Sequence, residues 1–210
     1  MIGACSFLRK KSQHSDAAFY SHWLNVHGPL AAQLHGVNRY LQNHFIVDSP
    51  HTNDLARSLN LNGLAEMWFE NETDRQICYD SKQEKVCDVD SLLFIGASAR
   101  VVTDVTPVIR PREPARGERV FLFTGDDPRD LGDIFKAIAG FPGVIGVTDH
   151  VVTKPGAEPT QEREAVQIKV SRIVTVTAND PGILDRAHDV VIAGGGDSIA
   201  VFDSTEHYLI

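Results

Sequence analysis

The sequence has few cysteines, and their spacing does not suggest a metal or redox motif. Cys5, Cys78 and Cys87 form no CxxC pair, and one of the three would stay unpaired in any disulfide scheme. Cys78 and Cys87 lie nine residues apart in a predicted helix, a separation of about 13 Å that is too long for a disulfide. We therefore expect three reduced thiols, no disulfide and no structural metal, as is usual for cytoplasmic proteins.

Basic charge and long apolar runs are also scarce. Lys and Arg number 20 against 28 Asp and Glu, giving a net charge of −8, whereas nucleic-acid binding needs a basic face. No run of about 18 apolar residues is present, so we expect no membrane span. In the N-terminal stretch 1–11 the basic residues follow the short apolar run, whereas in a secretory signal they precede it. We thus expect a globular cytoplasmic protein that binds neither nucleic acid nor membrane.

Several motifs of nucleotide, metal and nucleophile chemistry are absent from the sequence. It contains no nucleophile elbow, Walker loop, GxGxxG or EF-hand loop. The glycine run 194–196 follows a predicted helix and does not open one, which favours a turn over a phosphate cradle. We therefore predict chemistry without a cofactor.

Hydrophobic patterning in the first half predicts the order β-α-β-β-α-β. Strands are predicted over 3–9, 37–47, 63–69 and 99–109, and a second helical stretch over 71–95. The first helix begins at an N-cap formed by Ser15 and Asp16, bends at Pro29 and ends at Gly36. Its predicted apolar face consists of residues spaced three or four apart: Phe19, Trp23, Val26, Leu30 and Leu34.

The second half repeats this order after a Pro/Arg-rich segment over 107–117. Its strands are predicted over 119–124, 144–153, 166–177 and 198–209, with helices over 128–139 and 181–193. Each half is ferredoxin-like, and an open four-stranded sheet leaves one face uncovered. We predict an α+β fold of two tandem ferredoxin-like repeats, 1–109 and 118–210 with a linker over 110–117. The repeats would pack sheet to sheet as an internal pseudo-dimer enclosing a cavity.

Histidines are concentrated in the first half. Six of the nine lie within the first 51 residues: His14, His22, His27, His35, His44 and His51. On a regular helix His27 follows Trp23 by one turn at the edge of the apolar face, and His22 lies on the opposite flank. We therefore expect the rings of His22 and His27 to diverge and not to share a metal, since a zinc pair on a helix needs i,i+4 spacing and these residues are five apart.

Two strands carry polar side chains that could line a cavity. A period of two places Tyr40, Gln42 and His44 on one face of their strand, and Glu66 with Leu64 and Trp68 on one face of the next. We interpret these two faces as one cavity wall. The alternative is a solvent-exposed face, which would leave the large apolar side chain of Trp68 in contact with water. Burial would move the pKa values of carboxylates and imidazoles toward neutrality, which favours proton transfer.

Three segments resemble the EthD family, named for ethyl tert-butyl ether degradation and built as dimeric α+β barrels. They are FYSHWLNVHGPLAA from Phe19, GVNRYLQNH from Gly36 and GLAEMWF from Gly63. The resemblance covers about residues 3–109, and the ending EHYLI from Glu206 is similar to the family's terminal strand. The second half lacks the Tyr/Trp/His helix motif. The resemblance thus implies a tandem duplication whose degenerate second copy completes the barrel.

The resemblance implies an activity class only loosely. EthD-like and neighbouring barrels include cofactor-free dehydratases, decarboxylases, cyclases and isomerases, as well as proteins without established activity, and more distant barrels bind haem. We predict a cofactor-independent lyase or isomerase for a small, largely apolar carbonyl or phenolic metabolite. The alternatives are a non-catalytic small-molecule-binding accessory protein and a haem-using or cofactor-free monooxygenase. The sequence leaves a homodimer open.

The predicted site lies in the first half. His27 or His44 would be the general base and Tyr40 the hydrogen-bond donor to a developing oxyanion. The predicted substrate-contacting residues are His22, Trp23, Gln42, Glu66 and Trp68. We expect activity to follow a single ionisation near neutral pH, and loss of the base to cost about 10²-fold or more. Replacing His150 or His188 should cost far less.

Overall fold

A computed structural model describes residues 1–109, 117–124, 132–155, 164–195 and 198–210. The first half contains strands β1 (Ile2–Lys10), β2 (Arg39–Phe45), β3 (Gly63–Phe69) and β4 (Ile95–Ile109). Its helical segments are α1 (Asp16–His22), the π-helix η1 (Trp23–His27), α2 (Gly28–Ala31), α3 (Asp54–Leu59), α4 (Glu72–Tyr79) and α5 (Lys82–Phe94). The second half contains β5 (Gly117–Thr124), α6 (Gly132–Ala139), β6 (Val144–Pro155), β7 (Glu164–Ala165), β8 (Val170–Ala178), α7 (Pro181–Gly195) and β9 (Ile199–Tyr208).

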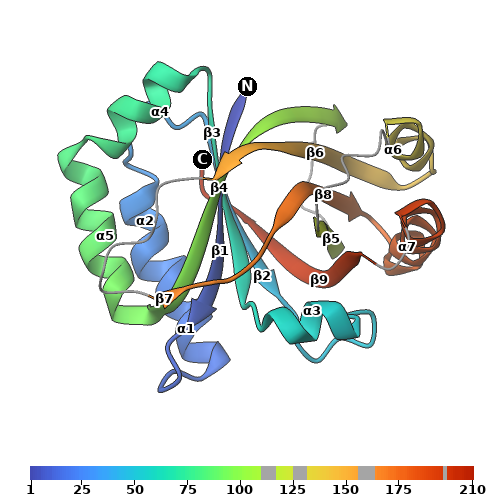
Figure 1. The fold of residues 1–210 in the computed structure, drawn as a ribbon, viewed down its shortest axis with the longest axis horizontal. Coiled ribbons are helices and arrows are strands. Elements are labelled where there is room, and N and C mark those ends of the chain that lie inside the picture. Colours follow the sequence, from blue (N-terminus) through green and yellow to red (C-terminus); the bar gives the residue numbers. More distant parts are fainter. Residues whose placement is uncertain (110–116, 125–131, 156–163, 196–197) are drawn as a thin grey trace.

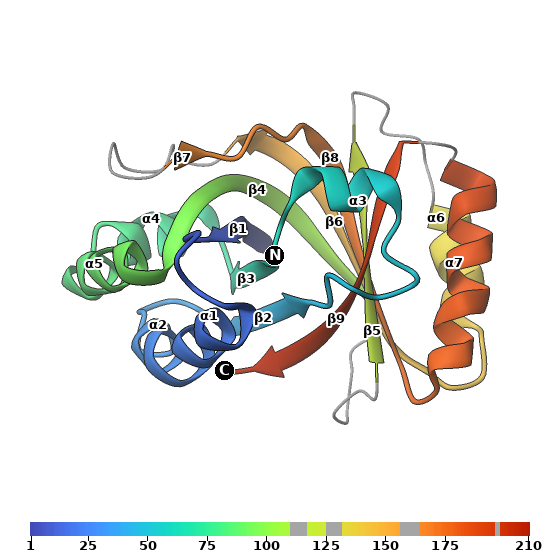
Figure 2. The ribbon, with the colours of Figure 1, turned by 90° about the horizontal axis from the view of Figure 1, so that it is seen from below.

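Eight strands of the described chain close into one antiparallel barrel (Figures 1 and 2). The first half contributes the order β4-β1-β3-β2, and the second half contributes β9-β5-β8-β6. The two sheets also join edge to edge, through β2 with β9 and β4 with β6. The protein is therefore an α+β barrel assembled from both halves of one chain.

Most of the predicted elements are present, with differences at their ends. Strand β4 continues through Pro107 to Ile109, so the predicted linker segment begins inside a strand, and its residues 110–116 lie outside the described residues. Helix α6 begins at Gly132; the predicted start at Pro128 lies outside the described residues. Helix α3 was not predicted from the sequence; its N-cap is Asn53, whose side chain accepts a hydrogen bond from the Ala56 backbone N–H.

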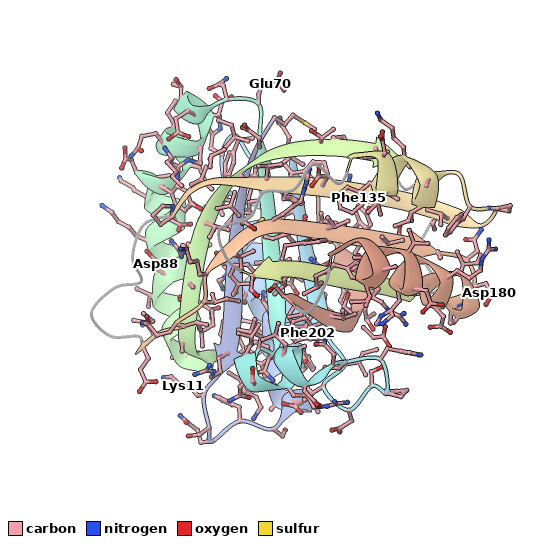
Figure 3. The ribbon with its side chains drawn as sticks, turned by 45° about the vertical axis from the view of Figure 1, so that its right-hand side comes forward. Lys11, Glu70, Asp88, Phe135, Asp180 and Phe202 are labelled. Atoms are coloured by element: carbon pink, nitrogen blue, oxygen red, sulfur yellow. The ribbon has the colours of Figure 1, made fainter. Side chains whose placement is uncertain are left out.

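Helices cover the outside of the barrel and side chains fill its inside. Figure 2 shows α1, α2, α4 and α5 beside the first sheet and α6 and α7 beside the second. One end of the interior is an apolar cluster drawn from both halves, which includes Phe7, Phe45, Leu122 and Phe202; of these, Phe202 is labelled in Figure 3. Helix α3 packs on this cluster through Ala56. The barrel is thus a packed core, and burial of these side chains joins the two halves.

The other end of the interior contains a buried ion pair between the halves. His150 Nε2 on β6 lies 2.9 Å from Glu66 Oε2 on β3. Asn43 Nδ2 donates to Glu66 Oε1 at 2.6 Å, and His150 Nδ1 lies 3.1 Å from Thr103 Oγ1. Burial lowers the pKa of His150, but Cys5 and the Glu66 carboxylate outweigh it and raise the pKa to about 10. The pKa of Glu66 is lowered because His150 outweighs the effect of burial.

We predict that His150→Ala destabilises the fold strongly. It would leave the Glu66 carboxylate buried (1% exposed) without its cation, which costs about 3–5 kcal/mol. Urea unfolding monitored by tryptophan fluorescence measures this loss, with His188→Ala on α7 as the second-half control. A loss below about 1 kcal/mol, the range of exposed pairs, would contradict the buried ion pair.

A second group of charges near this end makes stability depend on pH. Ser204 donates to Glu118, and Arg39 lies over the rings of Trp68 and Tyr208 with its guanidinium carbon 4.5 Å from each centroid. Burial and the Glu66 carboxylate raise the pKa of Glu206 to about 7, although Arg39 opposes them. The pKa of Glu118 is also raised, by burial first and then by Glu206.

Because the folded pKa of Glu206 exceeds its unfolded value, the protonated carboxyl stabilises the fold below about pH 4.5. That contribution falls as the pH rises through about 7. We predict that Glu206→Gln removes a stability loss of at most about 1.4 kcal/mol per pH unit in this window. Urea unfolding at a series of pH values checks this. Identical slopes for wild type and variant would show that Glu206 titrates normally.

Candidate functional site

A π turn interrupts the first helix at the segment that carries the predicted site residues. The Ser15 side chain caps α1 as predicted, and Gly36 takes a positive φ of 79° just beyond α2. Between α1 and α2, the Gly28 backbone N–H donates to the Trp23 carbonyl, five residues back. A π turn adds a residue to the helical turn. The prediction that Val26 is buried is therefore wrong, since Val26 is 46% exposed.

The π turn brings His22 and His27 to one carboxylate. His22 Nε2 lies 3.0 Å from Asp90 Oδ1, and His27 Nδ1 lies 2.9 Å from Asp90 Oδ2. The expectation that the two rings diverge is wrong, because it assumed regular α-helical spacing. In the wider π turn, residues five apart lie on the same side of the helix. His22 contacts Asp90 and is not among the residues that line the adjacent cavity.

Asp90 belongs to α5, and the sequence analysis did not identify it. The inner face of α5 carries small and polar residues, including Glu84, Cys87 and Ser91, while its outer face exposes Val86, Val89 and Leu93. This reversed pattern is the signal that could have identified α5 as a site helix, because an ordinary surface helix buries its apolar residues.

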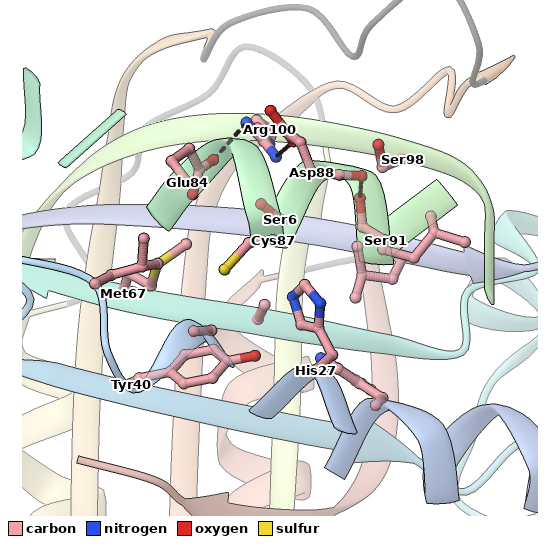
Figure 4. Close-up of a pocket in the computed structure, with 16 residues that line it drawn as sticks. Ser6, His27, Tyr40, Met67, Glu84, Cys87, Asp88, Ser91, Ser98 and Arg100 are labelled. Atoms are coloured by element: carbon pink, nitrogen blue, oxygen red, sulfur yellow. Dashed lines mark hydrogen bonds and ion pairs between the residues drawn. The ribbon is translucent and has the colours of Figure 1, made fainter. Parts of the chain in front are cut away.

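A cavity of about 40 Å³ lies between η1, α5 and the outer face of the first sheet. His27, Tyr40 and Trp23 line it from one side, and Cys87 and Ser91 from α5. Figure 4 shows the His27 ring and the Tyr40 hydroxyl turned toward the same space, with Cys87 across from them. The structure thus brings together a paired imidazole and a phenol, the two groups predicted to do acid–base chemistry.

Charged side chains line the same cavity at the β4 strand. Arg100 lies 3.8 Å from Glu84 Oε1 and 3.6 Å from Asp88 Oδ1, and all three residues line the cavity. Leu8, Leu34 and other apolar residues form the remaining wall. A ligand in this cavity would therefore meet an apolar surface with a few polar groups, as is usual in small-molecule sites.

Tyr40 is held as a protonated phenol. Gln42 Nε2 donates to the Tyr40 hydroxyl oxygen at 2.9 Å, and Tyr40 is 1% exposed. Burial raises the pKa of Tyr40 above its ordinary value, although hydrogen bonds from Gln42 and Trp23 oppose the shift. At neutral pH Tyr40 can therefore donate a hydrogen bond but cannot act as a base.

His44 is not among the residues that line this cavity. Its ring stacks on both Tyr20 and Trp23, with centroids 4.7 Å apart in each case, and its Nε2 lies 3.0 Å from Gln42 Oε1. It lines instead a separate surface pocket of about 320 Å³ with Tyr20 and His207. Burial and the nearby His207 lower the pKa of His44 to about 3. His44 is therefore a neutral ring behind Gln42.

Glu66 and Trp68 lie on the opposite face of the sheet from Tyr40. In the β2–β3 register Tyr40 pairs with Met67 and Leu41 pairs with Glu66, so Tyr40 faces the helices while Glu66 faces the barrel interior. The interpretation of these residues as one cavity wall is therefore wrong. Glu66 stabilises the interior as described above, and Trp68 Nε1 donates to it at 3.3 Å.

The described residues contain no group of three or more His, Cys, Asp or Glu side chains placed to hold a metal ion. Cys5, Cys78 and Cys87 are buried free thiols. None of the helices in the described ranges has the length and apolarity needed to cross a membrane.

Comparison with known families confirms the resemblance noted in the sequence. Residues 11–97 match the EthD domain, a region that includes α1 and ends at the start of β4. This matched region contributes every residue of the cavity named above, apart from Arg100 and part of the β1 wall. A search of curated proteins gives no match.

Solved structures that resemble the whole chain share its barrel. An anthrone oxidase-like protein is 8% identical, with 99% of this chain and 93% of that one covered and a TM-score of 0.59. A candidate monooxygenase from Lactobacillus acidophilus NCFM is 8% identical over 99% and 94%, with a TM-score of 0.59. A candidate chlorite dismutase is 10% identical over 97% and 94%, with a TM-score of 0.52. Identities this low show the fold alone.

We predict that Asp90 holds His22 and His27 in opposite tautomers. In the neutral state His22 would carry its proton on Nε2 and His27 on Nδ1, because each donates to the carboxylate. Long-range ¹H–¹⁵N spectra above the titration range of histidine report the tautomers. Asp90→Ala should release both rings and leave the exposed His35 signals unchanged. Unaltered His27 signals in the variant would refute the bridge.

Proposed function

We propose that the cavity between η1, α5 and the first sheet catalyses acid–base chemistry on a small carbonyl or phenolic compound, as a lyase or isomerase without a cofactor. The supporting observation is the Asp90–His27 pair, which lines the cavity together with the buried, protonated Tyr40. A base and an oxyanion donor in one apolar space are the two groups that enolisation requires.

His27 serves as the general base. His27 Nδ1 donates its proton to Asp90 Oδ2, with the two atoms 2.9 Å apart. Nε2 is therefore the ring nitrogen that takes the substrate proton. The carboxylate also stabilises the imidazolium that forms, as in other Asp–His pairs. His22 occupies the second oxygen of Asp90 at 3.0 Å and fixes the orientation of the carboxylate.

Tyr40 stabilises the charge that develops on the substrate oxygen. When His27 removes a proton from the carbon next to a carbonyl, the C–H electron pair moves into the carbon–carbon bond and the carbonyl oxygen becomes an oxyanion. The Tyr40 hydroxyl donates a hydrogen bond to this oxygen. The imidazolium then returns its proton to another carbon in an isomerisation, or to a leaving group in an elimination.

The size of the cavity limits what can bind without movement. About 40 Å³ is far below the several hundred Å³ of typical ligand pockets. A substrate larger than a few atoms therefore requires α5 or η1 to move away from the sheet. The polar contacts that hold α5 there, from Asp90 to His27 and from Arg100 to Asp88, would open with it.

The halves of the chain play different parts in this proposal. We interpret them as tandem ferredoxin-like repeats, because their strand orders correspond. In the second repeat α6 and α7 pack on the sheet through an apolar core that includes Phe135, Ile138 and Leu184. The second repeat would then complete the barrel while the first carries the chemistry.

Oxidation without a cofactor is the second candidate. The names of two neighbours, anthrone oxidase-like protein and monooxygenase, favour it. His27 would deprotonate a phenolic substrate, and the Tyr40 hydroxyl would donate a hydrogen bond to the electron-rich phenolate, which then reacts with O₂ as the oxidant. Oxygen consumption with a phenolic substrate would distinguish oxidation from isomerisation.

We predict that the protein accelerates exchange of the methyl protons of acetone in D₂O, measured by NMR. Acetone is a small ketone suited to the small cavity, and enolisation needs only a base and an oxyanion donor. His27→Ala and Tyr40→Phe should each lower the protein-dependent rate by about 10²-fold.

His35→Ala, in an exposed turn, is the matched control and should retain the rate. Equal rates for His27→Ala and His35→Ala would contradict the assignment of the base. A wild-type protein that does not accelerate exchange at all would favour the accessory binding role over catalysis.

A further inference from the structure

Gln42 is the centre of a buried hydrogen-bond chain that ends at Tyr40. Its side chain is fully buried and makes three hydrogen bonds. Nε2 lies 2.9 Å from the Trp23 carbonyl oxygen and 2.9 Å from the Tyr40 hydroxyl, and Oε1 lies 3.0 Å from His44 Nε2. The chain therefore links the surface pocket beside His44 to the helix-side cavity.

The direction of every bond in this chain follows from one backbone group. The Trp23 carbonyl can only accept, so the atom of Gln42 that faces it must be the amide nitrogen. The second amide proton then points to Tyr40, whose oxygen accepts. The Gln42 oxygen faces His44, so the neutral His44 must carry its proton on Nε2 and donate it.

We infer that Gln42 is a positioning residue that turns the Tyr40 hydroxyl proton into the cavity, an inference that rests on the proposed function. Because Tyr40 accepts from Gln42, its own proton is available to donate elsewhere. Gln42 and Trp23 hydrogen-bond to Tyr40 through their side chains, and both act as donors to it. The cavity is the space that remains for an acceptor.

This assignment restricts the class of ligand. The group opposite Tyr40 must be a hydrogen-bond acceptor, such as a ketone oxygen or a phenolate. A ligand that presents only donors there, such as an ammonium group, would leave the Tyr40 proton unpaired, and an unpaired buried donor costs about 1–3 kcal/mol. Gln42 and His44 do not line the cavity, so they act through Tyr40 and not on the substrate directly, in contrast to the roles predicted from the sequence.

The Trp23 carbonyl connects this hydrogen-bond chain to the π turn. The Trp23 oxygen accepts from the Gly28 N–H, which defines η1, and also from Gln42. A Cβ on residue 28 would lie 3.2 Å from Gln42 Nε2, which is tighter than most Cβ contacts, so glycine suits this position. The π turn that places His27 at the cavity thus also orients the Gln42 side-chain amide, and this amide in turn orients the Tyr40 hydroxyl.

The substitution Gln42→Glu tests the direction of the chain. A carboxylate has the shape of the amide but cannot donate to Tyr40, so the Tyr40 hydroxyl would donate to residue 42 instead. Protein labelled at tyrosine ¹³Cζ has only four such signals. The Tyr40 signal should move toward the phenolate position in Gln42→Glu and stay in place in Gln33→Glu, whose amide donates to the Pro29 carbonyl on the exposed face of α2. An unmoved Tyr40 signal in a folded Gln42→Glu protein would overturn the inference.

A measurement on the wild-type protein does not depend on the variant folding. Both side-chain amide protons of Gln42 should be protected from exchange with solvent, and one should show a nuclear Overhauser effect to the Tyr40 ring. The Gln33 amide should exchange rapidly. Rapid exchange of the Gln42 amide protons would overturn the inference.

Activity separates this inference from the proposed function. In the acetone exchange assay Gln42→Glu should lower the rate about as far as Tyr40→Phe, and should have no further effect in the Tyr40→Phe background. A loss in Tyr40→Phe with full activity in Gln42→Glu would overturn the role of Gln42 and leave the proposed function standing. Suppose instead that Tyr40→Phe keeps full activity and that the Tyr40 signal shifts in Gln42→Glu. This result would overturn the proposed function while confirming the direction of the hydrogen bonds.

Discussion

The contact between Asp90 and His27 is the interaction on which the site depends. It crosses from α5 to the π turn, and so joins two helical segments that lie over the same face of the first sheet (Figure 2). Without the π turn His22 and His27 could not share one carboxylate, and Asp90 is the α5 residue that both imidazoles contact. A one-residue irregularity in a helix thus creates a paired base, in keeping with the frequent occurrence of π turns at functional sites.

The first sheet separates two polar environments with different roles. Its outer face carries Tyr40 and Gln42, beneath helices and beside a cavity. Its inner face carries Glu66, which pairs with His150 from the second half inside the barrel. The inner charges are compensated within the barrel and link the halves, whereas the outer groups surround space that a ligand could fill. Because successive side chains of a strand point to opposite faces of the sheet, the polar groups that stabilise the barrel lie apart from those proposed for catalysis.

Much of the fold could be predicted from periodicity, but the details of the site could not. Ser15, Gly36 and the strand patterns indicated the eight barrel strands and their order, but not α3 or the π turn. A period of two shows which residues share a face of one strand, but not how neighbouring strands are matched, so Glu66 was placed beside Tyr40. A regular helix was assumed through His27, because nothing in the local composition signals a π turn. Asp90 was missed because its role depends on a contact across 63 positions of sequence.

The most direct test of the account is a crystal structure of the protein soaked in phenol, a small ligand with an aromatic ring and one oxygen. The account predicts phenol between His27 and Tyr40, with its oxygen accepting from the Tyr40 hydroxyl and Cys87 against the ring. Phenol found only in the surface pocket beside His44 and His207, with the helix-side cavity unchanged, would contradict it.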